Sequence, residues 1–165
     1  MIYQTLDDWD SWDYKPAVAY VVSHMGLYTK WLDLGSPLKL FEVQLPSWTV
    51  DIRKPPPDRN HLPWLQADVM NLPLEDASFD LLTSICVLCH VGMGRYGDPV
   101  KINAVDIMLK ECGRVLMSGG RFVCVPGPVA DQTSFQDHRH SIYTVEDLTL
   151  RLINAGFAAP DASEF

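Results

Sequence analysis

Acidic residues stand at the ends of three short apolar runs, where they could bind a ligand. Asp33, Asp51 and Asp68 each follow or end such a run. If these runs are parallel strands of one sheet, their carboxyl ends meet at the edge where open α/β sheets bind ligands. We expect Asp51 to accept hydrogen bonds from two ribose hydroxyls of an adenosine-type cofactor and Asp68 to bind its adenine amino group. Each Asp could instead cap a turn.

The residues beside these carboxylates complete the predicted cofactor site. A turn follows Asp33, an apolar residue follows each of the other two carboxylates, and a small hydroxyl side chain lies near the end of a fourth apolar run. The predicted cofactor-binding residues are Asp33, Gly35, Ser36, Asp51, Ile52, Asp68, Val69, Ser84 and Ile85.

A glycine-rich loop after the fourth apolar run carries a second set of polar side chains. His90, with an ordinary pKa near 6.5, could take a proton from a hydroxyl or an amine. Asp98 could orient that histidine or bind a sugar hydroxyl, and Tyr96 lies between them in the sequence. We predict His90, Tyr96 and Asp98 as the catalytic residues. The alternative is a loop whose polar side chains bond to its own backbone.

Two further patterns could suggest a metal or haem. The segment Cys86-Val-Leu-Cys89-His90 matches a haem attachment pattern, but its first cysteine falls in a predicted buried strand. The segment Asp137-His-Arg-His140 lacks further ligands at a known spacing, and a lid over an acceptor pocket is the better interpretation. We therefore predict buried thiols and no metal.

The apolar periodicity predicts the elements that position these residues. Short apolar runs predict strands at 30–35, 47–52, 64–68, 79–87 and 121–125. Amphipathic patterns predict helices at 38–45, 100–116 and 144–154. This alternation is typical of an α/β fold with a doubly wound, mainly parallel sheet. We expect one domain over 1–165, with an N-terminal helical cap at 1–29, a core at 30–157 and a tail at 158–165.

Composition narrows the class of protein. The chain has 165 residues, a formal net charge of -8 and only 13 Lys and Arg, scattered singly, so nucleic acid is not an expected partner. No run approaches the roughly 18 apolar residues that cross a bilayer, and the N-terminus does not resemble a secretion signal. We expect a cytoplasmic protein without membrane contact.

Several of these segments together resemble a known family. The matching segments, in order and spacing, are Leu32-Asp-Leu-Gly35, Val50-Asp-Ile52, Gln66-Ala-Asp68, Phe79-Asp80, Arg114-Val-Leu116 and Gly119-Gly-Arg-Phe122. They resemble the class I S-adenosylmethionine (SAM)-dependent methyltransferases over roughly residues 30 to 157. The resemblance implies a Rossmann-like fold, SAM as cofactor and methyl transfer to a small-molecule acceptor.

A longer motif resembles a narrower group within that family. His90-Val-Gly-Met-Gly-Arg-Tyr-Gly-Asp-Pro99 is similar to little-characterised methyltransferase-like proteins found near sugar and polysaccharide genes. This resemblance implies that the acceptor is a sugar or polysaccharide precursor.

Two departures from the family pattern motivate alternatives. Pro37 and Lys39 stand where the family usually has its second and third loop glycines. The antiparallel strand pair that usually ends the fold is missing after residue 157, so the strand at 121–125 would be an uncovered edge, suited to a homodimer. The alternatives are an inactive binding or scaffold protein and an enzyme acting on another nucleotide or nucleotide sugar.

Overall fold

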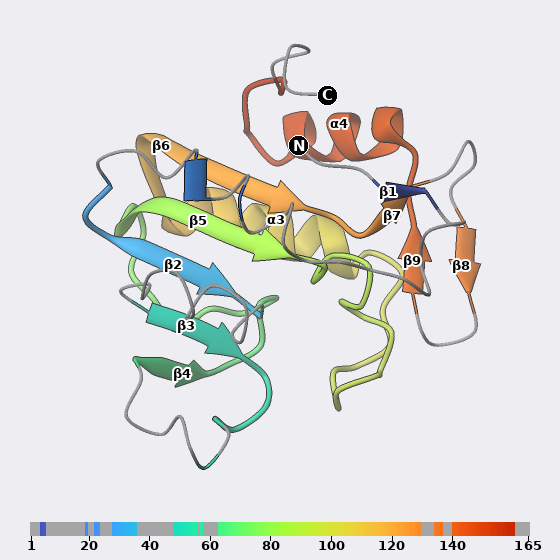
Figure 1. Ribbon diagram of the computed structural model, residues 1–165, viewed down its shortest axis with the longest axis horizontal. Helices are drawn as coiled ribbons and strands as arrows, with labels where there is room; N and C mark the ends of the chain where they lie inside the picture. The colour runs from blue at the N-terminus through green and yellow to red at the C-terminus, as the bar shows by residue number, and fades with distance from the viewer. Residues whose placement is uncertain are drawn as a thin grey trace.

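Five parallel strands form the centre of the protein (Figure 1). The computed structural model describes residues 4–5, 19, 22–23, 28–35, 48–55, 57, 63–129, 134–136 and 140–160. The strands are β2 (Trp31–Leu34), β3 (Trp48–Asp51), β4 (Trp64–Gln66), β5 (Phe79–Ile85) and β6 (Leu116–Val125). Their order is β4-β3-β2-β5-β6, and every neighbouring pair is parallel. The predicted doubly wound α/β fold is confirmed.

Strand order reverses at β2, which lies between β3 and β5. Asp33 of β2 is in register with Thr49 of β3 on one side and with Thr83 of β5 on the other. The strands that follow β2 in the chain therefore lie on opposite sides of it, β3 on one side and β5 on the other, and the carboxyl ends of the three strands share one edge of the sheet. This is the position at which doubly wound sheets bind ligands.

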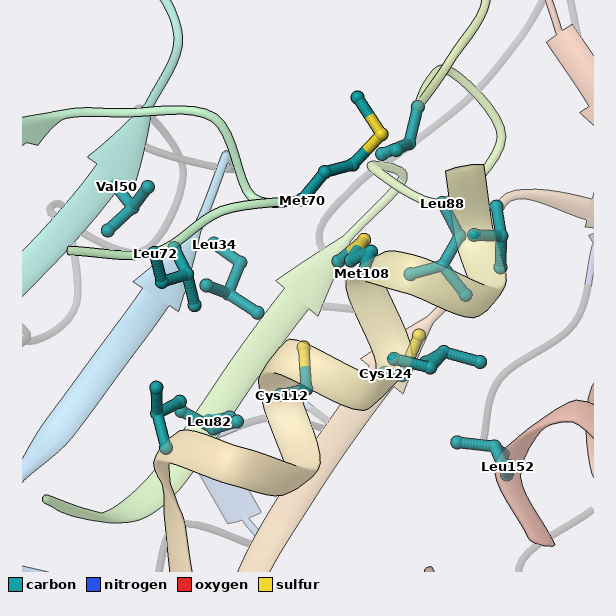
Figure 2. Close-up of a cluster of buried hydrophobic side chains, with 14 of the residues drawn as sticks. Leu34, Val50, Met70, Leu72, Leu82, Leu88, Met108, Cys112, Cys124 and Leu152 are labelled. Carbon is teal, nitrogen blue, oxygen red and sulfur yellow. The ribbon is translucent and has the colours of Figure 1, made fainter. Parts of the chain in front are cut away.

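One face of the sheet is covered by helices α3 (Ala104–Val115) and α4 (Val145–Asn154). Leu32 and Leu34 point to this face because alternate residues of a strand share a side. Met108 and Cys112 of α3 are completely buried against the same cluster, and Figure 2 shows α3 and α4 contributing side chains to it. This apolar layer fixes α3 and the loop before it on the sheet.

The opposite face carries a second apolar cluster, which includes Trp31, Leu81 and Val123. Val22 and Tyr28 pack against it, so the N-terminal segment covers this face where it is described. Ala19, Val22 and Ser23 are helical, while a helical cap over residues 1–29 stays a prediction. The cap prediction did not include a strand, yet β1 (Gln4–Thr5) pairs with β7 (Pro128–Val129).

Several predicted boundaries were wrong. Helix α3 begins at Ala104, not at residue 100, because the Lys101 amide bonds to Gly92 O at 3.0 Å and Ile102 and Asn103 form a turn. Strand β5 ends at Ile85, since Cys86 adopts φ 57°. The predicted helix at 38–45 lies outside the described residues.

The region around β6 also differs from prediction. Strand β6 follows α3 directly, and the irregularity in its pairing with β5 takes in Gly119 and Gly120, which had been expected to precede the strand. No strand is predicted between the strand at 121–125 and the helix at 144–154, but this region contains β7 and an antiparallel pair, β8 (Ser134–Gln136) and β9 (His140–Ile142). Strand β6 ends the five-stranded sheet, as predicted, while a homodimer through this edge stays a prediction. Within the described ranges, no helix is long and apolar enough to cross a membrane.

Four cysteines, Cys86, Cys89, Cys112 and Cys124, are buried as free thiols, as the sequence predicted. Burial raises the pKa of Cys89 and of Cys124 to about 12, from 9.0 for an ordinary thiol. The pKa values of Cys86 and Cys112 are raised for the same reason. These thiols stay protonated near neutral pH and have no thiolate to offer as a nucleophile or ligand.

The raised thiol pKa values predict a loss of stability at alkaline pH. Above the ordinary pKa of 9.0, thiols ionise in the unfolded chain but not in the folded one, so the free energy of unfolding should fall as pH rises. Each thiol contributes at most about 1.4 kcal/mol per pH unit. Urea unfolding at pH 8, 9 and 10 should show this decline, with a shallower slope for the double variant Cys89→Ala, Cys124→Ala. Equal slopes would contradict the prediction.

Candidate active site

Gly35 forms the turn at the end of β2, and its backbone conformation requires glycine. Its φ is 64°, in the left-handed region, and its amide donates to Val50 O at 2.7 Å. A Cβ at this position would lie 3.1 Å from both γ-carbons of Val87, which follows β5. The turn at the switch point therefore packs closely against Val87, and both its backbone conformation and this space require a residue without a side chain. Ser36, Pro37 and Lys39 lie outside the described residues.

Asp51 ends β3 with its side chain 4% exposed, and Arg53 neutralises its charge. The Arg53 amide donates to Oδ1 at 2.8 Å, Nε donates to Oδ1 at 2.9 Å, and a terminal guanidinium nitrogen donates to Oδ2 at 2.7 Å. The hydrogen bond and the negative charge of Asp51 raise the pKa of Arg53 although burial opposes the shift. A buried carboxylate needs such a partner, and both oxygens predicted to bind ribose are engaged by Arg53.

Arg53 connects Asp51 to the loop after β5. Its guanidinium carbon lies 4.6 Å from the centre of the Tyr96 ring. That ring also lies 5.4 Å from the guanidinium of Arg95 and makes an edge contact with His90 at 5.7 Å between centroids. Arg95 approaches His90 Nδ1 at 3.4 Å. We call Arg53, His90, Arg95 and Tyr96 the arginine–tyrosine cluster.

This cluster joins the two halves of the predicted site, because Asp51 was assigned to the cofactor while His90 and Tyr96 were assigned to catalysis. The sequence analysis gave no role to Arg53 or Arg95. An arginine two residues after a strand-end aspartate is the signal that could have found Arg53, since its guanidinium can return to that carboxylate.

Asp98, the third predicted catalytic residue, shapes its own loop. Its carboxylate accepts hydrogen bonds from the amides of Gly94 and Tyr96, each at 3.2 Å. Nearby, a Cβ on Gly92 would come within 2.2 Å of the Cβ of Ala104, so the loop packs closely against the start of α3. Asp98 thus holds the backbone that carries Tyr96. A catalytic role for His90, Tyr96 and Asp98 stays a prediction.

Asp33 is part of a polar row inside the sheet. It is completely buried, and Thr83 donates a hydrogen bond to its Oδ1 at 2.7 Å. The Trp31 indole donates in turn to the Thr83 hydroxyl at 2.8 Å. Ser84 and Ile85 are buried in β5, with 0% and 4% of their surfaces exposed. These three predicted cofactor residues therefore lie inside the sheet, and their assignment to the cofactor stays a prediction.

The loop after β4 carries the remaining predicted residues near the sheet edge. Asp68 Oδ1 accepts a hydrogen bond from the Met70 amide at 2.8 Å, so this carboxylate organises a local turn. Val69 is half-buried against the apolar cluster between the sheet and α3, which we call the α3 cluster. Ile52 lies next to Asp51, and its carbonyl accepts from the Gln66 side chain at 3.1 Å.

Arg114 anchors the rest of that loop to α3. Its guanidinium donates to the carbonyls of Leu72 at 2.9 Å and of Leu74 at 2.8 Å, and it pairs with Glu111 at 2.8 Å. Glu111 also accepts from the Leu72 amide at 2.9 Å. The loop after β4 is thus fixed by charged groups of the helix.

The pattern around Cys86 and Cys89 does not make a metal site. Cys89 Sγ lies 3.5 Å from the Cys86 carbonyl, and both thiols have raised pKa values. In the described part of the chain, no three His, Cys, Asp or Glu side chains gather as metal ligands would. The predicted lid at 137–140 lies outside the described residues except for His140, which begins β9.

Comparison with known families decides what kind of domain this is. Residues 26–124, which include Gly35, Asp51 and the whole arginine–tyrosine cluster, match the family model of the methyltransferase domain. The chain belongs to this methyltransferase family. A search of curated protein sequences found no match.

Solved structures support the same fold. A SAM-dependent methyltransferase of Thermotoga maritima is similar with a TM-score of 0.67 and 20% identity, over 93% of this chain and 78% of that one. The 1,6-didemethyltoxoflavin-N1-methyltransferase of Burkholderia thailandensis, solved with its acceptor and S-adenosylhomocysteine (SAH), is similar with a TM-score of 0.66 and 21% identity, over 90% and 72%. At this identity the likeness establishes the Rossmann-like methyltransferase fold.

The residues at the sheet edge fit the cofactor predicted from the sequence. Gly35 leaves its turn without a side chain, and Asp51 places a carboxylate at the end of the neighbouring strand. Such a carboxylate can accept hydrogen bonds from two ribose hydroxyls. This geometry, with the family and the SAH-bound neighbour, supports SAM as the cofactor.

Gly35→Ala should lower both stability and SAH affinity. Left-handed backbone costs a residue with a side chain about 1 to 2 kcal/mol, and the new Cβ would also press on Val87 at 3.1 Å. Gly119→Ala is the matched control, because Gly119 has φ 78° with no atom within 4 Å of the added Cβ. We expect Gly35→Ala to lower the free energy of unfolding more than Gly119→Ala does. Only Gly35→Ala should lower the affinity for SAH measured by calorimetry. Equal losses in the two variants would contradict this view of the turn.

Proposed function

We propose that this protein transfers a methyl group from SAM to a small-molecule acceptor, with a sugar or polysaccharide precursor as the first class to test. The family match over residues 26–124 is the observation that carries the proposal. The narrower group with the motif from His90 to Pro99 supplies the suggestion of a sugar acceptor.

Each part of the sheet edge has a proposed task. Asp51 would hold the two ribose hydroxyls, the turn at Gly35 would lie against the methionine portion, and Asp68 would reach the adenine. Bound SAM supplies the electrophilic methyl group. The protein's own contribution is mainly to align the acceptor atom with that group, which can supply most of the rate.

His90 is proposed to receive the proton that leaves the acceptor. An imidazole of ordinary pKa, about 6.5, can accept a proton from a hydroxyl or amine near neutral pH. Tyr96 contacts the His90 ring edge to face, and Asp98 holds the Tyr96 amide. Asp98 would then act as a positioning residue for this loop.

Asp51→Asn should weaken SAH binding without unfolding the protein. Removing the charge weakens hydrogen bonds from both ribose hydroxyls, and charge-assisted bonds contribute about 1.5 to 3 kcal/mol. That range corresponds to a loss of roughly 10- to 100-fold in affinity. Isothermal calorimetry with SAH measures it, with Glu75→Gln as a control that removes an exposed carboxylate from a distant turn.

Equal SAH affinity in Asp51→Asn and wild type would contradict the assignment of Asp51. Saturable SAH binding and transfer of labelled methyl from SAM to some member of a panel of sugars, sugar phosphates and amines would support the proposed function. The comparisons give no support to an inactive binding protein, and wild type that binds neither SAM nor SAH would overturn the proposal.

His90→Gln should lower the rate of methyl transfer by about 100-fold or more while SAH affinity is retained.

A further inference from the structure

The arginine–tyrosine cluster concentrates positive charge in an acidic protein. The whole chain has a net charge of -8, yet two guanidinium groups lie within 5.4 Å of the centre of one aromatic ring. We propose that Arg53 and Arg95, gathered around Tyr96, bind an anionic group of the methyl acceptor, either a phosphate or a carboxylate. This inference rests on the proposed function and specifies the acceptor's chemistry.

The exposure and chemistry of the cluster suit an oxyanion. The Arg53 side chain is 48% exposed although its partner Asp51 is buried, and Tyr96 is 38% exposed. A guanidinium presents parallel N-H donors that match two oxygens of a phosphate or carboxylate. Both guanidinium groups lie over the Tyr96 ring, and the ring leaves their charges in place, since its contribution is a weak cation–π attraction.

Asp51 keeps Arg53 occupied until the cofactor arrives. The ribose hydroxyls are expected at the same carboxylate oxygens that Arg53 now contacts at 2.7 to 2.9 Å. Ribose binding would therefore compete with the guanidinium of Arg53, which already lies over Tyr96 and can turn to a new anion there. Because coupling between two ligands is reciprocal, a bound anion should also favour the cofactor.

The position of the cluster would bring the acceptor to the predicted proton acceptor. Tyr96 contacts the His90 ring, and Arg95 lies 3.4 Å from His90 Nδ1. An anion bound by the two arginines is therefore adjacent to His90. A neighbouring hydroxyl or amine on the same molecule would lie next to the imidazole.

Anion titrations of the full chain test the proposal. Inorganic phosphate and acetate, each titrated at constant ionic strength, are followed by calorimetry with and without saturating SAH. We expect at least one anion to bind about tenfold more tightly when SAH is present. Preference for phosphate identifies a phosphorylated acceptor, and preference for acetate identifies a carboxylate acceptor. Failure of both anions to bind the SAH-saturated protein overturns the proposal.

Variants separate this site from a general effect of charge. Arg53→Gln and Arg95→Gln should each lower the affinity for the anion about tenfold, whereas Arg53→Lys should retain part of that affinity. Lys110→Gln, which removes an exposed positive charge from α3, should leave it unchanged. Thermal unfolding of each variant verifies that it is folded. Equal anion affinity in Arg53→Gln, Arg95→Gln and Lys110→Gln would refute the site.

Asp51→Asn gives a test that does not require the cofactor. Removing this negative charge should free Arg53 and strengthen anion binding severalfold in the absence of SAH. The same variant should bind SAH more weakly. Weaker anion binding in Asp51→Asn would contradict the role given to Arg53. If wild type fails to bind SAH, the proposed function fails, but this variant still decides whether the anion site exists.

Discussion

Parallel pairing of β2 with both β3 and β5 is the constraint on which the site depends. Because all five strands run in one direction, the turn at Gly35, the carboxylate of Asp51 and the loop after β5 reach the same edge. Because side chains alternate along β2, Leu32 and Leu34 lie in the α3 cluster. Asp33 points to the other face and accepts a hydrogen bond from Thr83. The buried sheet thus fixes the backbone positions from which the site is built.

Local electrostatics at this edge differ from those of the whole molecule. The net charge of -8 would repel an anion at long range, but screening limits that repulsion to about 10 Å at an ionic strength of about 0.1 M. Within the arginine–tyrosine cluster, direct contacts dominate: Asp51 pairs with Arg53, and both Arg53 and Arg95 contact the Tyr96 ring. The same arginine thus links the proposed cofactor carboxylate to the proposed acceptor loop.

The sequence predicted the elements whose signals are local. The helix predicted at 144–154 is α4: Thr144 caps it by accepting from the Asp147 amide at 2.9 Å, and Gly156 follows it with φ 94°. Glycines at 119 and 120 misled the prediction because a strand can accommodate them at an irregular pairing. The inward direction of Asp33 and the contact of Arg53 with Tyr96 depend on strand parity and on distant segments. Neither could be read from residue spacing alone.

The central claim is that the carboxylate of Asp51 receives the ribose of the cofactor and releases Arg53 toward the acceptor side. A crystal structure of the full chain with SAH tests it most directly. We predict both ribose hydroxyls within hydrogen-bonding distance of the Asp51 carboxylate, with the guanidinium of Arg53 turned away from Oδ1 and Oδ2 and still on the Tyr96 ring. SAH bound elsewhere, or bound with the Asp51 to Arg53 pair intact at its present 2.7 Å, would contradict the account.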